Sequence, residues 1–148
     1  MLDDSARHRL VQLARGWIGT PYRHNARLQG IGVDCGQLPL AVYAEAGLIP
    51  ELPIDHMPPQ IHLHTETTSY LDTVLTYTRE MPEPTGPGDF VLFHVAKAWH
   101  HGGIITHWPR IIHANSEAGL VMEEDASIAP LARKILIERQ PRFFTVMA

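Results

Sequence analysis

The sequence has a single cysteine, no long apolar run and no cluster of basic residues, and each absence excludes a class of protein. One cysteine cannot form a disulfide within the chain. No segment approaches the roughly 20 apolar residues that a membrane-spanning helix requires. The 12 Lys and Arg residues against 16 Asp and Glu residues leave a net charge of -4, and they form no patch that would follow a phosphate backbone. We therefore expect no membrane insertion and no nucleic-acid partner.

The first ten residues, MLDDSARHRL, also lack the features of a secretory signal. They are acidic where a signal peptide is basic, and no apolar segment follows them. We therefore expect a soluble protein that is made in the cytoplasm without a signal peptide.

What the chain does contain is typical of one globular domain, which we place at residues 1–148. Hydrophobic residues make up 45% of the sequence and charged residues 19%, as in ordinary folded proteins. A domain of this size buries roughly 70% of the surface that its unfolded chain exposes. The length therefore suffices for a substantial core.

The spacing of the apolar residues predicts helices first and strands afterwards. Helices are expected at Asp4–Ile18, Cys35–Ala46, Ser69–Thr78 and Pro130–Lys134. Strands are expected at Phe90–Phe93, Gly103–Thr106, Arg110–Ala114, Gly119–Glu123 and Phe143–Met147. Helices followed by an antiparallel meander predict an α+β domain.

Cys35 is a candidate nucleophile. We expect it at the N-terminus of a helix, where the helix dipole and a nearby histidine lower a thiol pKa from about 8.5 into the range of about 3.5 to 7.5. The alternative is a small buried core residue, since free cysteines are often fully buried. The neighbours Asp34 and Gly36 favour the reactive thiol, because they are poor partners in an apolar core.

His101 and His113 are candidates for the base and its orienting partner. They fall on two consecutive predicted strands, separated by a turn at Trp108-Pro109, so antiparallel pairing would place them on one sheet face. In that arrangement His113 holds His101 in the required tautomer. The alternative is a pair of half-buried histidines that bind the backbone.

The remaining histidines offer a competing metal site, above all His56, His62 and His64. Their spacing fits no zinc motif, and the chain has no second cysteine to complete one. We therefore expect neither a metal nor a cofactor. The histidines near the predicted strands, His94, His100 and His107, are expected at the surface or at strand edges, with His100 a candidate to line the cleft.

Five short motifs stand out along the chain. They are Gly19-Thr20-Pro21-Tyr22, Asp34-Cys35, Pro87-Gly88-Asp89, His101-Gly102-Gly103-Ile104 and Ile112-His113-Ala114. Their order and spacing, from about Ala14 to Val121, resemble those of the NlpC-type bacterial cell-wall peptidases. The resemblance implies a papain-like cysteine peptidase fold.

The resemblance also implies a role for each residue that matches. Cys35 corresponds to the nucleophile, His101 to the general base and His113 to the third, orienting residue. Tyr22 corresponds to the tyrosine that helps to form the oxyanion site. Asp34 corresponds to the acidic residue that supports the nucleophile loop and the substrate.

The substrate that the resemblance implies is an amide bond in peptidoglycan stem peptides, typically the γ-D-glutamyl-diaminopimelate bond, cleaved through an acyl-enzyme. Arg23, beside Tyr22, is the candidate to bind a substrate carboxylate, and Gly36 lies next to the nucleophile in the expected substrate site. The family usually follows its nucleophile with Ser-Gly, whereas this chain has Gly36-Gln37.

The details of the sequence look most like the small phage- and prophage-encoded branch of the family. These details are Asp34-Cys35-Gly36-Gln37, the His- and Pro-rich middle and the stretch from Trp108 to Ala114. The likeness implies a lysin that acts on the cell wall from a phage particle or after release, with phage tail proteins as candidate partners. Two alternatives stay open: a structural tail component without the activity, which Gly36-Gln37 suggests, and a thiol acyltransferase with the same Cys-His machinery.

Overall fold

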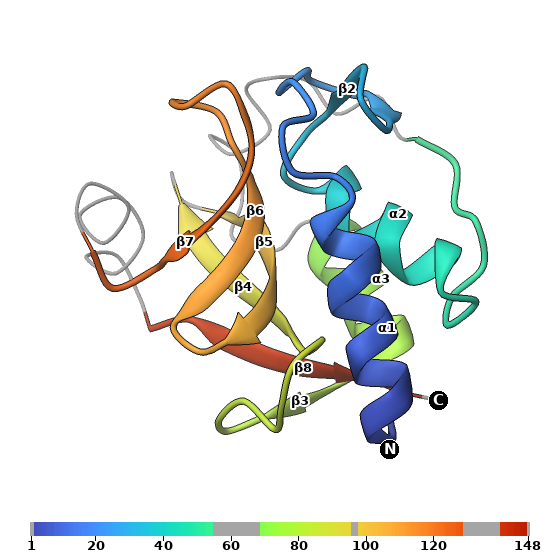
Figure 1. The fold of residues 1–148 in the computed structure, drawn as a ribbon. Helices are drawn as coiled ribbons and strands as arrows, with labels where there is room; N and C mark the ends of the chain where they lie inside the picture. The colour runs from blue at the N-terminus through green and yellow to red at the C-terminus, as the bar shows by residue number, and fades with distance from the viewer. Residues whose placement is uncertain (1, 55–68, 96–97, 129–139, 148) are drawn as a thin grey trace.

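The computed structural model describes residues 2–54, 69–95, 98–128 and 140–147, which form helices packed beside a curved sheet (Figure 1). The helices are α1 (Asp4–Arg15), α2 (Gln37–Glu45) and α3 (Ser69–Tyr77). A small hairpin, β1 (Arg27–Leu28) and β2 (Gly32–Val33), lies between the first two helices in sequence. The remaining strands are β3 (Thr78–Met81), β4 (Phe90–Val95), β5 (Ala98–His107), β6 (Arg110–Asn115), β7 (Leu120–Asp125) and β8 (Arg142–Val146).

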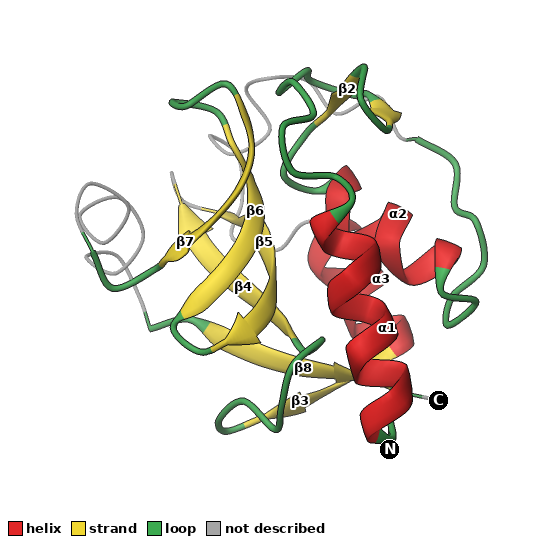
Figure 2. Ribbon diagram, in the orientation of Figure 1, coloured by secondary structure: helices red, strands yellow, loops and turns green. Residues whose placement is uncertain are grey.

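The main sheet has six strands in the order β3-β8-β4-β5-β6-β7, and all its pairs are antiparallel. Strands β4 to β7 form a meander, and β8 returns to pair with β4 and β3. The helices lie together on one side of this sheet (Figure 2). The arrangement confirms the predicted α+β class.

Apolar side chains line both faces of the sheet. The larger cluster fills the space between helices and sheet, with Leu10 and Leu38 from the helices and Phe90, Ile104 and Ile112 from the strands. The smaller cluster, on the other face, contains Val91, Phe93, Ile105, Ile111 and Ala126. Neighbouring residues of one strand belong to different clusters, because successive side chains of a strand point to opposite faces.

Helix α1 begins with a capped turn and ends earlier than predicted. The side chain of Asp3 accepts a hydrogen bond from Ala6 N at 2.8 Å, which satisfies an N–H group that has no partner within the helix. The helix ends at Arg15 rather than at Ile18, because the chain continues from Gly16 in tighter turns.

A buried ion pair joins α1 to the start of β4. Arg7 Nη1 donates to Asp89 Oδ1 at 2.9 Å, and both side chains are buried. The second oxygen of Asp89 accepts hydrogen bonds from Thr85 N and Thr85 Oγ1, each at 2.6 Å, and from Gly86 N at 3.2 Å. Gly88 has a φ of +88°, which favours glycine. This Pro-Gly-Asp motif therefore has a structural role at the junction of helix and sheet.

Helix α2 begins two residues later than predicted. Its first helical residue is Gln37 and its N-cap is Gly36, so Cys35 lies just before the helix and not in its first turn. Pro39 is the third helical residue, where its missing N–H costs nothing, because the first four N–H groups of a helix have no partner within it.

The other predicted elements are confirmed with shifted ends, and three strands were not predicted. The hairpin β1–β2 and strand β3 are two to four residues long, too short to produce an alternating pattern. The predicted helix at Pro130–Lys134 and the His56, His62 and His64 segment lie outside the described residues. Within the described ranges, no helix is long and apolar enough to cross a membrane.

Candidate active site

Cys35 lies in the short connection between β2 and α2, where it is buried. The hydroxyl of Tyr22 donates a hydrogen bond to Cys35 Sγ at 3.7 Å. The structure thus brings together two of the residues that the sequence singled out, from segments 13 residues apart. The Tyr22 segment is held beside β2 by Arg23 N, which donates to Val33 O at 3.0 Å.

The environment of Cys35 raises the pKa of its thiol to about 12. The largest cause is burial, which disfavours the charged thiolate, and the second is the negative charge of Asp34. The hydrogen bond from Tyr22 and the backbone N–H groups of Cys35 and Gly36 lower the pKa, but by less. The sequence predicted a lowered pKa for this thiol, and that prediction is wrong for this structure. Burial of Cys35 raises the pKa by more than the hydrogen bonds lower it.

Asp34 organises the loop that carries Cys35. Its Oδ1 accepts hydrogen bonds from Gly36 N at 3.1 Å and Gln37 N at 2.9 Å, which caps the start of α2. Its Oδ2 accepts one from Asn25 N at 2.7 Å, and His24 Nδ1 lies 3.9 Å away. The carboxylate is buried, so these contacts account for its support of the loop.

His101 and His113 lie on β5 and β6 and form a hydrogen-bonded pair. His101 Nε2 and His113 Nδ1 are 2.8 Å apart, with the ring planes at 79°. His113 is fully buried, whereas His101 is partly exposed. Phe93 of β4 packs against the His101 ring at a centroid distance of 6.0 Å. The predicted pairing of the two histidines on one sheet face is confirmed.

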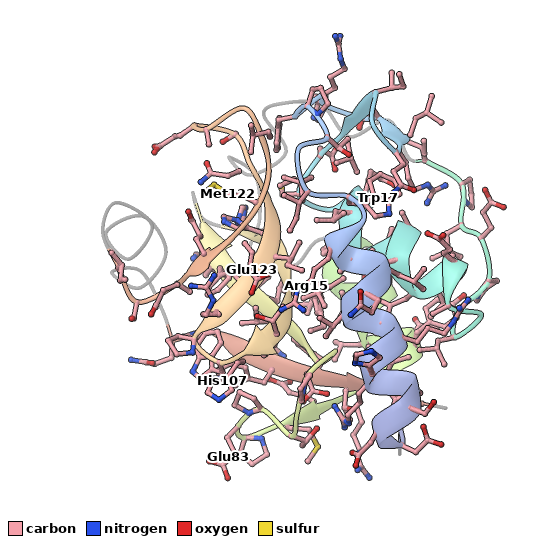
Figure 3. The ribbon with its side chains drawn as sticks, viewed as in Figure 1. Arg15, Trp17, Glu83, His107, Met122 and Glu123 are labelled. Carbon is pink, nitrogen blue, oxygen red and sulfur yellow. The ribbon has the colours of Figure 1, made fainter. Side chains whose placement is uncertain are left out.

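Glu124 of β7 extends this pair and was not among the site residues predicted from the sequence. Its Oε1 lies 3.0 Å from His113 Nε2. The preceding residue, Glu123, points instead toward Arg15 of α1 (Figure 3), with Oε1 3.2 Å from Arg15 Nε. The predicted strand ended at Glu123 and therefore left Glu124 out. Placing Glu124 beside His113 also requires the register between β6 and β7, which the sequence pattern does not give.

Tyr70 of α3 lies against both the residue after Cys35 and the residue after His101. An ideal Cβ added to Gly36 would lie 3.2 Å from the Tyr70 ring, and one added to Gly102 would lie 3.2 Å from the Tyr70 hydroxyl oxygen. Because these glycines directly follow Cys35 and His101, the backbone segments that carry the thiol and the imidazole both approach Tyr70. The buried Tyr70 hydroxyl has no hydrogen-bond partner among the described residues.

The two glycines after His101 are required by close packing. An ideal Cβ on Gly102 would lie 2.6 Å from the ring of Phe90, closer than real Cβ contacts. One on Gly103 would lie 3.0 Å from Ile111 Cδ1. The His-Gly-Gly motif therefore lets β5 pass tightly between its neighbours, which fixes the backbone that carries the imidazole.

Arg23 lies at the exposed edge of the site. Its Nε donates to Ile31 O at 3.2 Å, and its side chain packs over Gly32, where an ideal Cβ would lie 2.5 Å from Arg23 Cδ. The guanidinium is thus held at the surface beside Ile31 and Gly32, where a charged ligand can reach it.

Two further histidines on the strands, His94 and His107, differ in burial. His107 is exposed, as expected. His94 is buried against Trp99, with ring centroids 5.1 Å apart, so its expected surface position is wrong. Across the described ranges, no group of three or more His, Cys, Asp or Glu side chains is placed to hold a metal ion.

Comparison with family models matches residues 19–139 to the NlpC/P60 family. That segment contains the Cys35 loop, His101, His113 and Glu124. The chain belongs to the NlpC/P60 family. Comparison with curated proteins gave no significant match.

Solved NlpC/P60 structures share this fold. The NlpC/P60 domain of the peptidoglycan hydrolase SagA is 17% identical, with 95% of this chain and 98% of that chain covered and a TM-score of 0.56. A lipoprotein-like NLP/P60 protein from Staphylococcus aureus is 21% identical, with a TM-score of 0.64 over 95% of this chain and 42% of that chain. RipD from Mycobacterium tuberculosis is 11% identical, with 96% and 98% covered and a TM-score of 0.59. RipD is described as a non-catalytic domain adapted to peptidoglycan binding.

Proposed function

We propose that this NlpC/P60 protein is a cysteine peptidase that hydrolyses an amide bond in peptidoglycan stem peptides. The observation that supports the proposal most strongly is the His101-His113 pair at 2.8 Å, in a chain whose one cysteine, Cys35, accepts a hydrogen bond from the Tyr22 hydroxyl. A thiol, a base and a group that orients the base are the parts that nucleophilic acyl transfer requires.

In the first half of the proposed reaction, Cys35 Sγ attacks the carbonyl carbon while His101 accepts the thiol proton. Because the pKa of the thiol is raised, the proton leaves during the attack and not beforehand. The Tyr22 hydroxyl and backbone N–H groups stabilise the oxyanion of the tetrahedral intermediate. The C–N bond then breaks, His101 returns its proton to the leaving amine, and a thioester on Cys35 remains.

In the second half, His101 removes a proton from water, and the resulting hydroxide attacks the thioester. The C–S bond breaks, the acid is released and Cys35 recovers its proton from His101. The reaction consumes one water molecule and uses no metal or cofactor.

The proposed bond is the one between γ-D-glutamate and diaminopimelate. Stem peptides carry free carboxylates around this bond, and a charge-assisted hydrogen bond to such a group contributes roughly 1.5 to 3 kcal/mol. Arg23, exposed beside Tyr22, is our candidate for that contact. We also propose a phage or prophage setting, in which the protein reaches the wall from a tail particle or after release.

The experiment is digestion of purified sacculi, followed by mass spectrometry of the soluble products. Stem peptides cut between glutamate and the diamino acid are expected from the natural protein, with and without EDTA. Cys35→Ala and His101→Ala should release none, while remaining folded by circular dichroism.

Other products would overturn the proposal. Sugar-chain fragments would exclude a peptidase. Binding of sacculi without any cleavage would indicate a binding or structural role, such as the tail component. Transfer of the acyl group to an added amine in place of water would indicate the acyltransferase.

A further inference from the structure

The hydrogen bonds around His113 determine which ring nitrogens carry protons. A neutral imidazole has one N–H donor and one acceptor nitrogen, whereas a carboxylate only accepts. Glu124 Oε1, 3.0 Å from His113 Nε2, therefore requires the proton of His113 on Nε2. His113 Nδ1 is then the acceptor of the 2.8 Å bond, and His101 must donate to it from Nε2. His101 Nδ1 is left with its lone pair.

We propose that Glu124 is a positioning residue that fixes this tautomer chain, so that His101 presents Nδ1 as the base toward the nucleophile. The proposal rests on the proposed function, in which His101 accepts the Cys35 proton. Without Glu124, either nitrogen of His113 could carry its proton, and the acceptor for His101 Nε2 would be present only part of the time.

Because His113 is buried, its hydrogen-bond partners decide which of its ring nitrogens carries the proton. His113 is fully buried, and burial lowers its pKa, although the hydrogen bond and the charge of Glu124 act in the opposite direction. His113 is therefore neutral at neutral pH, and water does not reach its ring to stabilise either tautomer. When His101 accepts a proton, the carboxylate at the other end of the chain stabilises the positive charge through His113.

The placement of Glu124 follows from the register of β6 and β7. His113 pairs with Met122, and Ile111 pairs with Glu124, so all four side chains share one sheet face and Glu124 is the diagonal neighbour of His113. The amide of Asn115 lies 3.5 Å from Glu124 Oε1 and helps to hold the carboxylate.

The test is the tautomeric state of the histidines, measured by long-range ¹H–¹⁵N correlation spectra of histidine-labelled protein without substrate. We expect the natural protein to show His113 and His101 protonated on Nε2. Glu124→Ala should give a mixture of tautomers at His113. Glu123→Gln is the matched control, since Glu123 lies on the opposite face of the same strand, and its spectrum should equal that of the natural protein.

If the protein cleaves stem peptides, Glu124→Ala should also lower kcat by about 10- to 100-fold, with a smaller change in KM. An unchanged His113 tautomer in Glu124→Ala, or an unchanged kcat, would overturn the proposal. The tautomer measurement needs no substrate, so failure of the peptidase hypothesis and failure of the Glu124 hypothesis give different results.

Discussion

At the scale of single residues, burial controls how the site can work. The thiol of Cys35 and the ring of His113 are both removed from water, which favours the neutral form of each. In the proposed reaction, both groups are therefore uncharged before the attack, and proton transfer accompanies it.

The first prediction concerns the reactivity of Cys35. Only the thiolate is alkylated, so a raised pKa lowers the rate at every pH below that pKa. With a pKa of about 12, the rate of iodoacetamide labelling should be slow at pH 7 and rise about tenfold per pH unit up to pH 10. An ordinary thiol, with a pKa of about 8.5, would already level off in that range.

Tyr22→Phe provides the internal comparison for this measurement. It removes a hydrogen bond that lowers the pKa of Cys35, so labelling at pH 8 should become slower still. A rate that reaches its plateau below pH 8 would contradict this account and would indicate a preformed thiolate–imidazolium pair.

The sequence could predict the candidate residues whose chemistry is distinctive. Cys35 is the only cysteine, and the strand pattern brought His101 and His113 together. Glu124 and Tyr70 could not be found in the same way. The position of Glu124 beside His113 depends on the register of β6 and β7, and the position of Tyr70 depends on how α3 packs against the sheet. The pKa of Cys35 was predicted in the wrong direction, since its sign depends on burial, which spacing does not reveal.

At the scale of elements, the site depends on how α1 is fixed to the sheet. The ion pair of Arg7 and Asp89 is buried, and Asp89 also holds the loop that precedes β4. Removal of one partner leaves an uncompensated buried charge. The free-energy cost of that charge exceeds the stabilisation that the intact pair provides.

The second prediction follows from this pair. Arg7→Met should lower the free energy of unfolding by about 3 to 5 kcal/mol, measured by urea denaturation. Arg9→Met on the same helix is the control, since Arg9 is exposed, and it should change the value by less than about 0.5 kcal/mol. If the two substitutions lowered the free energy of unfolding equally, the buried pair would stabilise the protein no more than an exposed arginine does.

The spacing of apolar residues predicted most helices and strands, but it did not predict where they begin and end. Helix α2 starts at Gln37 because Asp34 caps it through the N–H groups of residues 36 and 37, whereas the apolar pattern alone began at Cys35. Strand β3 pairs with β8 far along the chain, and the two strands of the hairpin β1–β2 have only two residues each, so no local apolar pattern predicts any of the three strands.

At the scale of the whole molecule, the proposed site draws on both layers of the fold. The helical layer and its loops supply Cys35, Tyr22 and Tyr70, and the sheet supplies His101, His113 and Glu124. Solved relatives with the same fold include a peptidoglycan hydrolase and a non-catalytic domain, so the fold alone does not decide between catalysis and binding.

The central claim, that Cys35 is the nucleophile, is tested most directly by trapping the thioester. The protein is mixed with a stem peptide, quenched in acid within milliseconds to seconds and weighed intact by mass spectrometry. We predict an added mass equal to the acyl half of the peptide, located on Cys35 by digestion and removed by hydroxylamine. Cleavage of the peptide with no adduct on Cys35, together with normal cleavage by Cys35→Ala, would contradict the account.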